Sequence, residues 1–227
     1  MAFTIVRRLL RRTAAVTAAT ILTCAAAAAV ATPALAAPPK AATLTLDDRV
    51  DLQRVEQYLN GIRTLTARFT QYSPDGGTAE GVLYLSRPGH MRFEYDAPSP
   101  IMLLADGTWV IYYDKNLKQV TYLPIGSTPA WFLLRNDISL EGDVTITKFE
   151  RGPGVLRATL VETKHPENGT VTLTLSDKPM ELKQWSLVDA QSKTTTVVLS
   201  EPRIGAPIDP SVFAFDDPRP HGPQGGQ

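Results

Sequence analysis

The spacing of apolar positions divides the chain into one helical stretch followed by a long series of strands. From residue 44 to residue 65 the apolar side chains recur close to a helical period, at Val50, Leu52, Val55, Leu59 and Ile62. Acidic residues open this stretch and Gly61 weakens its end, as is typical of helix termini. The pattern predicts one amphipathic helix.

From Leu65 onward apolar residues alternate with polar ones, which predicts β-strands. The third candidate strand sends Met91, Phe93 and Tyr95 to one face and polar side chains to the other, so one face is expected to be apolar and one wet. Strands this short and closely spaced pair antiparallel, because parallel neighbours need crossovers of about a dozen residues. The eleven candidates are 65–72, 79–87, 90–97, 100–105, 108–114, 119–124, 143–150, 155–163, 169–176, 181–189 and 194–200.

A tight turn is predicted between the second and third strands. Pro88 has the fixed φ angle, and Gly89 the positive φ angle, that a type II turn requires. Arg87 is therefore expected at the end of a strand.

Residues 126–137, GSTPAWFLLRND, predict a second, shorter helix between the sixth and seventh strands. Ser127 or Thr128 is the expected N-cap, and Pro129 suits the first turn. Four bulky apolar residues follow without a polar break, so this helix needs cover on more than one side. It is either a plug in the core or a lid that faces a ligand, and the residues alone favour the plug.

The composition limits how the sheet is covered. The chain has 227 residues, of which 43% are hydrophobic, and this predicts about one domain with a sizeable core. A long curved sheet with an apolar face and only two helices to cover it leaves a cavity unless it closes into a small barrel. We therefore expect the apolar face to line a pocket.

The amino terminus has the features of an export signal. A basic head is followed by an Ala-rich apolar run and by the small residues of Ala34-Leu35-Ala36. This pattern predicts a cleaved signal peptide over residues 1–36, with a linker at 37–45. The alternative is a membrane anchor that stays attached, since the apolar run from Ala14 to Val30 is about long enough to span.

Cys24 is the only cysteine, and two interpretations compete for it. The sequence ILTC resembles a site for lipid attachment, although Thr23 is a poor residue before the cysteine. Otherwise Cys24 leaves with the signal peptide, and the exported protein has no cysteine. No disulfide is then possible, so the core alone holds the fold.

The charge balance argues against nucleic acid as a partner. The whole chain has 23 basic and 23 acidic residues, and four of the arginines lie within residues 1–36. Without that segment 19 basic residues face 23 acidic ones, a net charge of −4. Phosphate binding requires a basic face instead.

Side chains that carry catalysis are scarce. The three histidines, His90, His165 and His221, lie in a hairpin turn, a loop and a Pro/Gly-rich tail. No catalytic triad, metal-type histidine spacing or phosphate-binding loop is present in the sequence. We therefore expect no enzymatic activity, no metal and no cofactor.

Two groups of side chains have both a functional and a structural interpretation. Asp47, Asp48 and Asp51 suggest a cation site, but a solvated helix start is favoured because their spacing does not direct them to one point. The aromatic residues of TWVIYYDK, residues 108–115, suggest a stacking platform for a sugar or base. Cross-strand packing within the sheet is the favoured interpretation of Trp109, Tyr112 and Tyr113.

Four segments together resemble a known family. They are RFTQYSPDGGTAEGVLYLSRPGHMRFEY, LLADGTWVIYYDKNLKQVTYLPI, STPAWFLLRND and DPSVFAFDDP. In this order and spacing they are similar to LolA, the periplasmic outer-membrane lipoprotein carrier family of Gram-negative bacteria. The likeness runs over residues 46–218. It implies an unclosed antiparallel β-barrel of about eleven strands, with helices as a lid over a hydrophobic cavity.

The resemblance also implies site residues. Arg87 corresponds to an arginine that hydrogen-bonds carbonyls of the lid helices and keeps the empty cavity shut. The lid helix corresponds to Thr128, Pro129, Trp131, Phe132, Leu133 and Leu134, which reverses the preference for a plug. The expected positions in contact with acyl chains are Phe69, Leu83, Met91, Phe93, Tyr95, Val171, Leu173 and Leu175.

The implied partners are acylated lipoproteins, an ATP-driven (ABC-type) inner-membrane transporter that supplies them, and the outer-membrane acceptor LolB. The protein is expected in the periplasm as a monomer, with a flexible tail at residues 219–227. Three alternatives stay open. They are a membrane-anchored acceptor, marked by lipidation of Cys24, a carrier of another amphiphilic lipid, and a periplasmic hydrolase of lipid or glycan.

Overall fold

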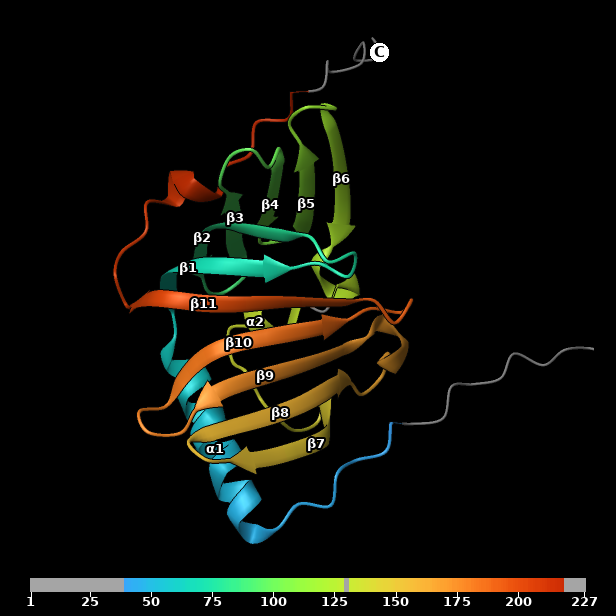
Figure 1. Ribbon diagram of the computed structural model, residues 1–227, viewed down its shortest axis with the longest axis vertical. Helices are drawn as coiled ribbons and strands as arrows, with labels where there is room; N and C mark the ends of the chain where they lie inside the picture. Colours follow the sequence, from blue (N-terminus) through green and yellow to red (C-terminus); the bar gives the residue numbers. More distant parts are fainter. Residues whose placement is uncertain (1–38, 129–130, 219–227) are drawn as a thin grey trace, which may run out of the picture. The chain divides into compact units, whose positions relative to one another are not determined.

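Eleven antiparallel strands form one sheet in the described part of the chain, residues 39–128 and 131–218 of the computed structural model (Figure 1). All eleven predicted strands are present, with ends that differ by a residue or two, except that the last strand continues to Ile204. The strands are β1 (Thr64–Tyr72), β2 (Thr78–Ser86), β3 (His90–Tyr95), β4 (Ile101–Asp106), β5 (Trp109–Asp114), β6 (Gln119–Pro124), β7 (Val144–Gly152), β8 (Val155–Glu162), β9 (Thr170–Ser176), β10 (Glu181–Val188) and β11 (Thr194–Ile204).

The sheet consists of two meanders joined through the first and last strands. Its order is β6-β5-β4-β3-β2-β1-β11-β10-β9-β8-β7. Strands β1 and β11 pair antiparallel from Leu65 opposite Ile204 to Tyr72 opposite Thr196. Because β6 and β7 lie at opposite edges, the sheet is not closed, as the family resemblance implies.

Helix α1 (Leu46–Gly61) begins with a capping box, in which the Thr45 side chain and the Asp48 carboxylate each accept from the other's backbone N–H. It ends at the predicted Gly61. Its buried residues are Leu52, Val55 and Leu59. Val50, which the helical spacing assigns to the apolar face, is 55% exposed. It precedes Leu52 by two residues, so its side chain points about 200° away around the helix.

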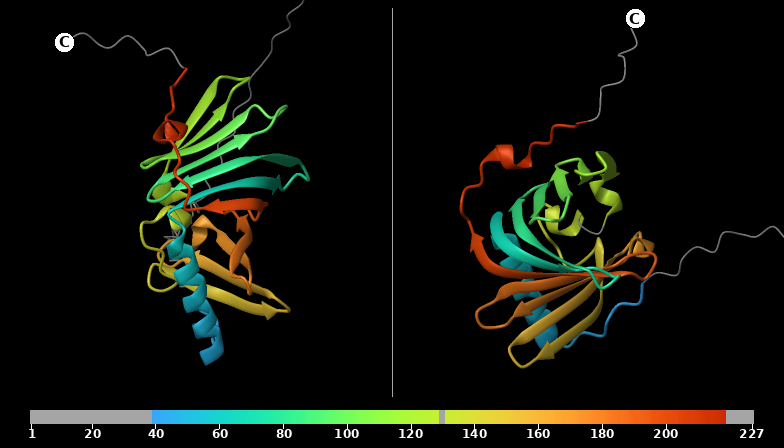
Figure 2. Two further views of the ribbon diagram at one scale, coloured as in Figure 1. Left: turned by 90° about the vertical axis from the view of Figure 1, so that its left-hand side faces the viewer. Right: turned by 45° about the horizontal axis from the view of Figure 1, so that its top comes forward.

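The connection between β6 and β7, described at residues 125–128 and 131–143, lies on the inner, concave face of the sheet (Figure 2). It contains the 3-10 turn η1 (Ile125–Ser127) and the four-residue helix α2 (Trp131–Leu134). Phe132 and Leu134 are buried and their two neighbours half-buried, so α2 is covered on more than one side, as predicted. The Thr128 hydroxyl donates to the Ile125 carbonyl at 2.9 Å. Together α1 and residues 125–143 are called the cover below.

Some expectations fall outside the described residues. These are the signal peptide, Cys24, Pro129 of the expected lid and the tail at 219–227. No helix in the described ranges is both long enough and apolar enough to cross a membrane. The two further 3-10 turns are η2 (Pro166–Asn168) and η3 (Pro210–Phe213).

The outer face of β4 and β5 is not solvent-exposed, contrary to the expectation from alternation. Met102, Leu104 and Ile111 are buried there beneath Phe213 of η3 and the residues on either side of it. The Arg92 guanidinium donates to the Val212 carbonyl at 3.1 Å and so holds this segment. Figure 2 shows η3 on the outer side of the sheet and α2 on the inner side. The sheet therefore has an apolar core on both faces at β4 and β5.

Candidate functional site

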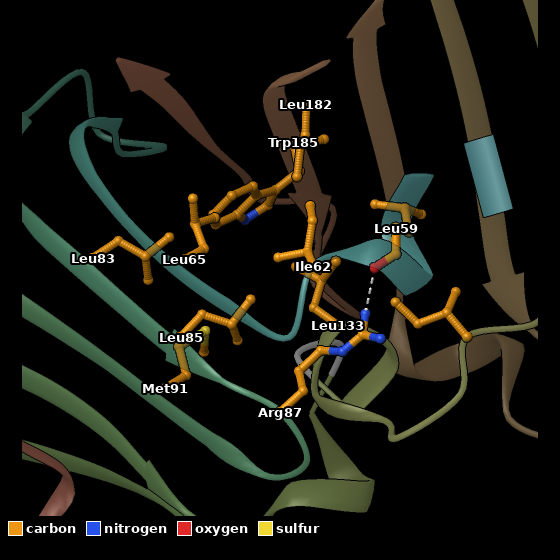
Figure 3. A pocket seen from close by; sticks show the side chains of 11 residues that line it. Leu59, Ile62, Leu65, Leu83, Leu85, Arg87, Met91, Leu133, Leu182 and Trp185 are labelled. Atoms are coloured by element: carbon orange, nitrogen blue, oxygen red, sulfur yellow. Dashed lines mark hydrogen bonds between the residues drawn. The ribbon is translucent and has the colours of Figure 1, made fainter. Parts of the chain in front are cut away.

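A small apolar cavity lies between the concave face and the cover (Figure 3). Its volume is about 20 Å³. A cavity of about 10–15 Å³ holds one water molecule. An acyl chain therefore does not fit unless the cover moves. The lining residues are Leu59, Ile62, Leu65, Leu83, Leu85, Arg87, Met91, Leu133, Ile138, Leu182 and Trp185.

The cavity wall is assembled from four parts of the chain. Strands β1, β2 and β3 form one side and β10 another, while α1 and the connection at 125–143 close it from the concave side (Figure 3). Because successive side chains of a strand point to opposite faces, the apolar side chains at alternate positions point inward. Apart from Arg87, every lining residue is apolar.

The predicted acyl-chain positions all lie in one apolar core, but only Leu83 and Met91 line the cavity. Val171 lies at a separate small hollow beside α2. The other five, Phe69, Phe93, Tyr95, Leu173 and Leu175, pack against neighbouring side chains. Their contact with acyl chains stays a prediction. Trp185 and Leu182 of β10 were missed, and alternation alone would place them on opposite faces, because only the bulge between Leu182 and Gln184 turns both inward.

Aromatic side chains pack tightly beside the cavity. The Phe69 ring meets Phe93 at 4.9 Å and Tyr95 at 5.1 Å between centroids, both edge-on. Gly81 lies opposite both Phe69 and Tyr95 in the pairing of β1, β2 and β3. A Cβ atom at this position would lie 2.1 Å from the Glu94 carbonyl oxygen, so only glycine allows the contact.

The polar end of Tyr95 is satisfied and uncharged. Its hydroxyl donates to Gln71 Oε1 at 2.7 Å. Burial, with a smaller effect of Tyr112, raises the pKa of Tyr95 to about 12. The phenol therefore stays neutral at physiological pH, and this wall of the core has no charge.

The turn between β2 and β3 places Arg87 against the cover. Gly89 has the predicted positive φ, 84°, and the Arg87–Pro88 peptide is cis, which the sequence did not predict. The Gly89 N–H donates to the Leu134 carbonyl of α2 at 2.8 Å. The turn and α2 are thus joined through the backbone.

Arg87 is only 8% exposed and is the one charged or polar residue in the described ranges that is classed as buried. Its Nη1 donates to the Leu59 carbonyl at 2.8 Å, and its Nη2 donates to the Asn136 carbonyl at 3.2 Å and to Asn60 Oδ1 at 3.4 Å. These acceptors belong to α1 and to the connection. We call Arg87, Leu59, Asn60 and Asn136 the latch.

The latch holds a charge without a bonded counter-ion. Among the described residues no carboxylate bonds the Arg87 guanidinium, and its Nε has no hydrogen-bond partner. Burial, and then the nearby Arg63 charge, lower the pKa of Arg87 from its usual value, while Asp137 acts in the opposite direction. A buried cation with neutral acceptors is held weakly, because its desolvation offsets much of the bonding.

Two further side chains bind α1 to the connection. The Asn60 amide donates to the Ile138 carbonyl at 2.7 Å, and its Oδ1 accepts from the Ile138 N–H at 2.8 Å. Glu56 Oε2 accepts from the Leu140 N–H at 2.8 Å. Nothing in the sequence pattern marked these residues, because their partners are backbone groups about 80 positions away.

The amino-terminal half of α1 is held differently, by charge pairs. Arg54 donates to Asp51 and to Asp177, both at 2.8 Å, and Arg151 donates to Asp51 at 2.8 Å. We call these four residues the anchor. Burial acts to raise the pKa of Asp51, but the hydrogen bonds from Arg151 and Arg54 outweigh it, and the pKa is lowered.

Two of the aspartates of α1, Asp48 and Asp51, have structural roles, but Asp51 is bonded to two arginines instead of being solvated as expected. Asp48 belongs to the capping box and Asp51 to the anchor. Within residues 39–128 and 131–218, no group of three or more histidine, cysteine or acidic side chains could hold a metal ion.

The aromatic residues of β5 do not form one platform. Trp109 meets Tyr122 of β6 at 6.3 Å, and Tyr113 meets Phe215 at 5.6 Å, both by edge-on ring contacts. Packing is thus the correct interpretation of these two residues. Tyr112 lies on the other face of β5 and is 41% exposed.

The fold and the site together define a class of protein, an open antiparallel sheet with an apolar cavity beneath a latched cover. Residues 60–216 match the family model for the outer membrane lipoprotein carrier protein LolA. The chain belongs to the LolA family.

Curated relatives support this assignment along most of the chain. An outer-membrane lipoprotein carrier protein of Pseudomonas paraeruginosa is 33% identical over 181 residues, which covers 76% of this chain and 86% of the relative. One from Chromobacterium violaceum is 30% identical and covers 82% and 88%. Among solved structures, the LolA superfamily protein NE2245 of Nitrosomonas europaea has 9% identity and a TM-score of 0.41, covering 72% of this chain and 97% of that one.

Proposed function

We propose that this protein is a periplasmic carrier of lipoproteins. It binds the acyl chains of lipoproteins released from the inner membrane and delivers them to the outer membrane. The observation that carries the proposal is a cavity lined by ten apolar side chains and one arginine, where that arginine holds the cover shut. Membership of the LolA family supports the same function.

The physical chemistry of acyl chains explains why a carrier is needed. Three acyl chains contain on the order of 45 methylenes, and each costs about 0.8 kcal/mol to expose to water, roughly 35 kcal/mol in all. Free diffusion of such a lipoprotein is therefore excluded. Moving from a bilayer into an apolar cavity exchanges one apolar medium for another, so the carrier needs only a modest net affinity.

The latch tunes that affinity. The closed cavity of about 20 Å³ has to expand before it holds an acyl chain. The free energy spent on opening the cover is subtracted from the binding free energy of the cargo. A latched carrier consequently holds its cargo less tightly than an open one, and an acceptor with a preformed site takes the cargo from it.

The amino-terminal sequence pattern and the family resemblance suggest the route. The segment at residues 1–36 directs the chain to the periplasm, an ABC-type transporter in the inner membrane supplies the cargo, and an acceptor in the outer membrane receives it. The carrier acts as a monomer, with one cargo to each protein. Transfer breaks no covalent bond, so the proposal includes no catalytic step and no cofactor.

A release assay tests the proposal. Purified residues 37–227 are added to spheroplasts that make palmitate-labelled lipoproteins, and the label is followed into the supernatant. We expect a soluble one-to-one complex. If no label is released while the same spheroplasts respond to their own carrier, the proposal is wrong, and mass spectrometry of lipid bound to the protein identifies another amphiphile.

A further inference from the structure

The two edges of the open sheet differ in how they are protected. At the β7 edge the Ala42 N–H donates to the Ile146 carbonyl at 2.8 Å, so the preceding segment covers part of it. A bulge interrupts the pairing of β7 with β8 between Ile146 and Lys148, and β7 also contains Glu150 and Arg151. Bulges, charges and covering segments are the usual means of preventing an edge strand from pairing with another chain.

The β6 edge has neither a bulge nor a charged residue, and its one blocking residue is Pro124 at its end. Its sequence, QVTYLP, contains no charged residue, and its pairing with β5 runs in regular register from Trp109 opposite Pro124 to Asp114 opposite Gln119. No strand of the described residues pairs with its outer side. An uncharged edge of β-branched and aromatic residues is suited to accept another strand.

The backbone groups that point outward can be assigned. The Ile125 N–H donates to the Thr108 carbonyl at 3.1 Å, which marks these opposed residues as a hydrogen-bonded pair. Hydrogen-bonded and non-bonded pairs alternate along an antiparallel ladder. Leu123 and Thr121 therefore bond to β5, while Val120 directs its N–H and C=O away from the sheet. Pro124 falls on the outward register as well, where its missing N–H costs no bond to β5.

The β6 edge is continuous with the concave apolar face. Ala105, Val110 and Leu123 lie opposite one another across β4, β5 and β6, and the first two belong to the core beneath the cover. Tyr112 is 41% and Leu123 45% exposed, so this apolar surface reaches the edge uncovered. Three strand spacings, about 14 Å, separate β6 from Met91 of the cavity wall on β3. Four or five extended residues span that distance.

We propose that the β6 edge binds the extended peptide that directly follows the acylated residue of a bound lipoprotein, as an added twelfth strand. The inference rests on the proposed carrier function, since the acyl chains must occupy the cavity for the attached peptide to reach β6. The backbone of the peptide pairs with β6 whatever its sequence, which suits a carrier of many lipoproteins. The first few residues of the cargo act as a tether, and the next six or so form the strand.

Two lipopeptides test the proposal on the intact soluble chain, residues 37–227. Both begin with a tripalmitoylated cysteine. One continues for two residues and the other for twelve residues of a soluble Thr/Ser-rich sequence. We expect the longer lipopeptide to bind about tenfold more tightly, from a few added backbone hydrogen bonds. Methylation of alternate backbone nitrogens in the longer peptide removes the gain without any change to the protein.

A matched pair of variants locates the pairing. Val120→Pro removes an outward N–H and leaves the bonds to β5, and Val120→Thr keeps both the N–H and the branched side chain. We expect Val120→Pro to abolish the gain of the longer lipopeptide and to leave binding of the short one unchanged. Val120→Thr behaves like the unaltered chain. If Val120→Pro does not fold, the methylated peptide still tests whether the backbone of the cargo pairs with β6.

Each contrary result has its own meaning. Equal binding of the two lipopeptides overturns the edge proposal and leaves the carrier function intact. A gain that survives both methylation and Val120→Pro also overturns it. A dimer of the empty protein that Val120→Pro abolishes in sedimentation assigns the edge to a second copy of the chain instead. Binding of neither lipopeptide overturns the carrier proposal, and this inference with it.

Discussion

The two halves of α1 are attached to the rest of the protein by opposite means. In the amino-terminal half, the anchor places Asp51 between two arginines, with Asp177 as a second carboxylate. In the carboxyl-terminal half, the latch places one buried arginine among neutral carbonyl and amide oxygens. Paired opposite charges satisfy each other, whereas a lone buried cation keeps much of its desolvation cost. We therefore expect the latch to be the end that opens at lower free energy.

The difference defines how the cover works. The anchor fixes α1 to Arg151 near the end of β7 and to Asp177 in the β9–β10 turn. The latch joins the other end to the β2–β3 turn. The Gly89–Leu134 and Glu56–Leu140 hydrogen bonds beside it hold residues 134–140. On this hypothesis, opening at the latch exposes the cavity while α1 stays attached at its amino-terminal end. Substitutions at the latch should change cargo transfer, and substitutions at the anchor should change stability.

Arg87→Leu should have the largest effect. It removes the latch but also the cost of a buried charge, so we expect the melting temperature to change by only a few degrees. Cargo should be held about tenfold more tightly, which corresponds to about 1.4 kcal/mol, and delivery to an acceptor should fall by the same factor. Transfer of a labelled lipoprotein to outer-membrane vesicles measures this. Arg68→Leu, at an exposed arginine of β1, is the control, and normal delivery by Arg87→Leu would refute the latch.

Asn60→Ala should have a smaller effect of the same kind. It removes both hydrogen bonds to Ile138 and one acceptor of Arg87, but keeps the guanidinium in place. We expect a loss of about 1 kcal/mol in the free energy of unfolding and roughly threefold slower delivery. Denaturant titration and the same transfer assay measure the two effects. A stability loss without any change in delivery would separate Asn60 from the latch.

Asp51→Asn should affect stability alone. It removes the carboxylate that both Arg54 and Arg151 bind, at a cost of about 1 kcal/mol, or roughly 2–4 °C in melting temperature. Delivery should stay within twofold of the unaltered chain. Asp47→Asn, one helical turn earlier, is the matched control and should change neither the melting temperature nor delivery. A large loss of delivery in Asp51→Asn would show that the two halves of α1 are not independent.

Acid should loosen the anchor before the latch, and this is the smallest expected effect. The folded-state pKa of Asp51 is lowered, so its stabilising contribution is complete above the ordinary pKa of about 3.9 and is lost as the pH falls through the lowered value. The acceptors of the latch do not titrate. Between pH 5 and pH 3, amide exchange corrected for its intrinsic rate should rise in residues 48–54 relative to 134–138, a range that leaves out Leu140 because its N–H donates to the Glu56 carboxylate. The same difference should be absent from Asp51→Asn.

Local patterns predicted most of the fold. Alternation located all eleven strands, and the acidic residues Asp47 and Asp48 and Gly61 marked the two ends of α1, although its N-cap, Thr45, was not predicted. The pairing of β1 with β11 could not be predicted from the sequence. It joins residues some 130 positions apart, and no hairpin turn fixes its register. The apolar outer face of β4 was missed, although the unbroken apolar run at residues 101–105 is typical of a strand buried on both sides.

The site was less accessible to sequence reasoning. Arg87 was identified through a family resemblance, because an arginine beside a turn is ordinarily solvated. Its partners are backbone carbonyls, which every residue has and which no sequence pattern distinguishes. Asn60 and Asn136 were therefore not predicted, and neither was the contrast between latch and anchor, which depends on contacts between distant segments.

Amide exchange in the loaded protein tests the central claim most directly, that the cover opens at the latch and stays attached at the anchor. Hydrogen–deuterium exchange would be compared between the empty chain and its complex with a tripalmitoylated lipopeptide. The account predicts faster exchange at Gly89 and in residues 134–140, whose N–H and C=O groups close the cover, and no change in residues 48–54. Faster exchange at 48–54, with 134–140 still protected, would contradict it.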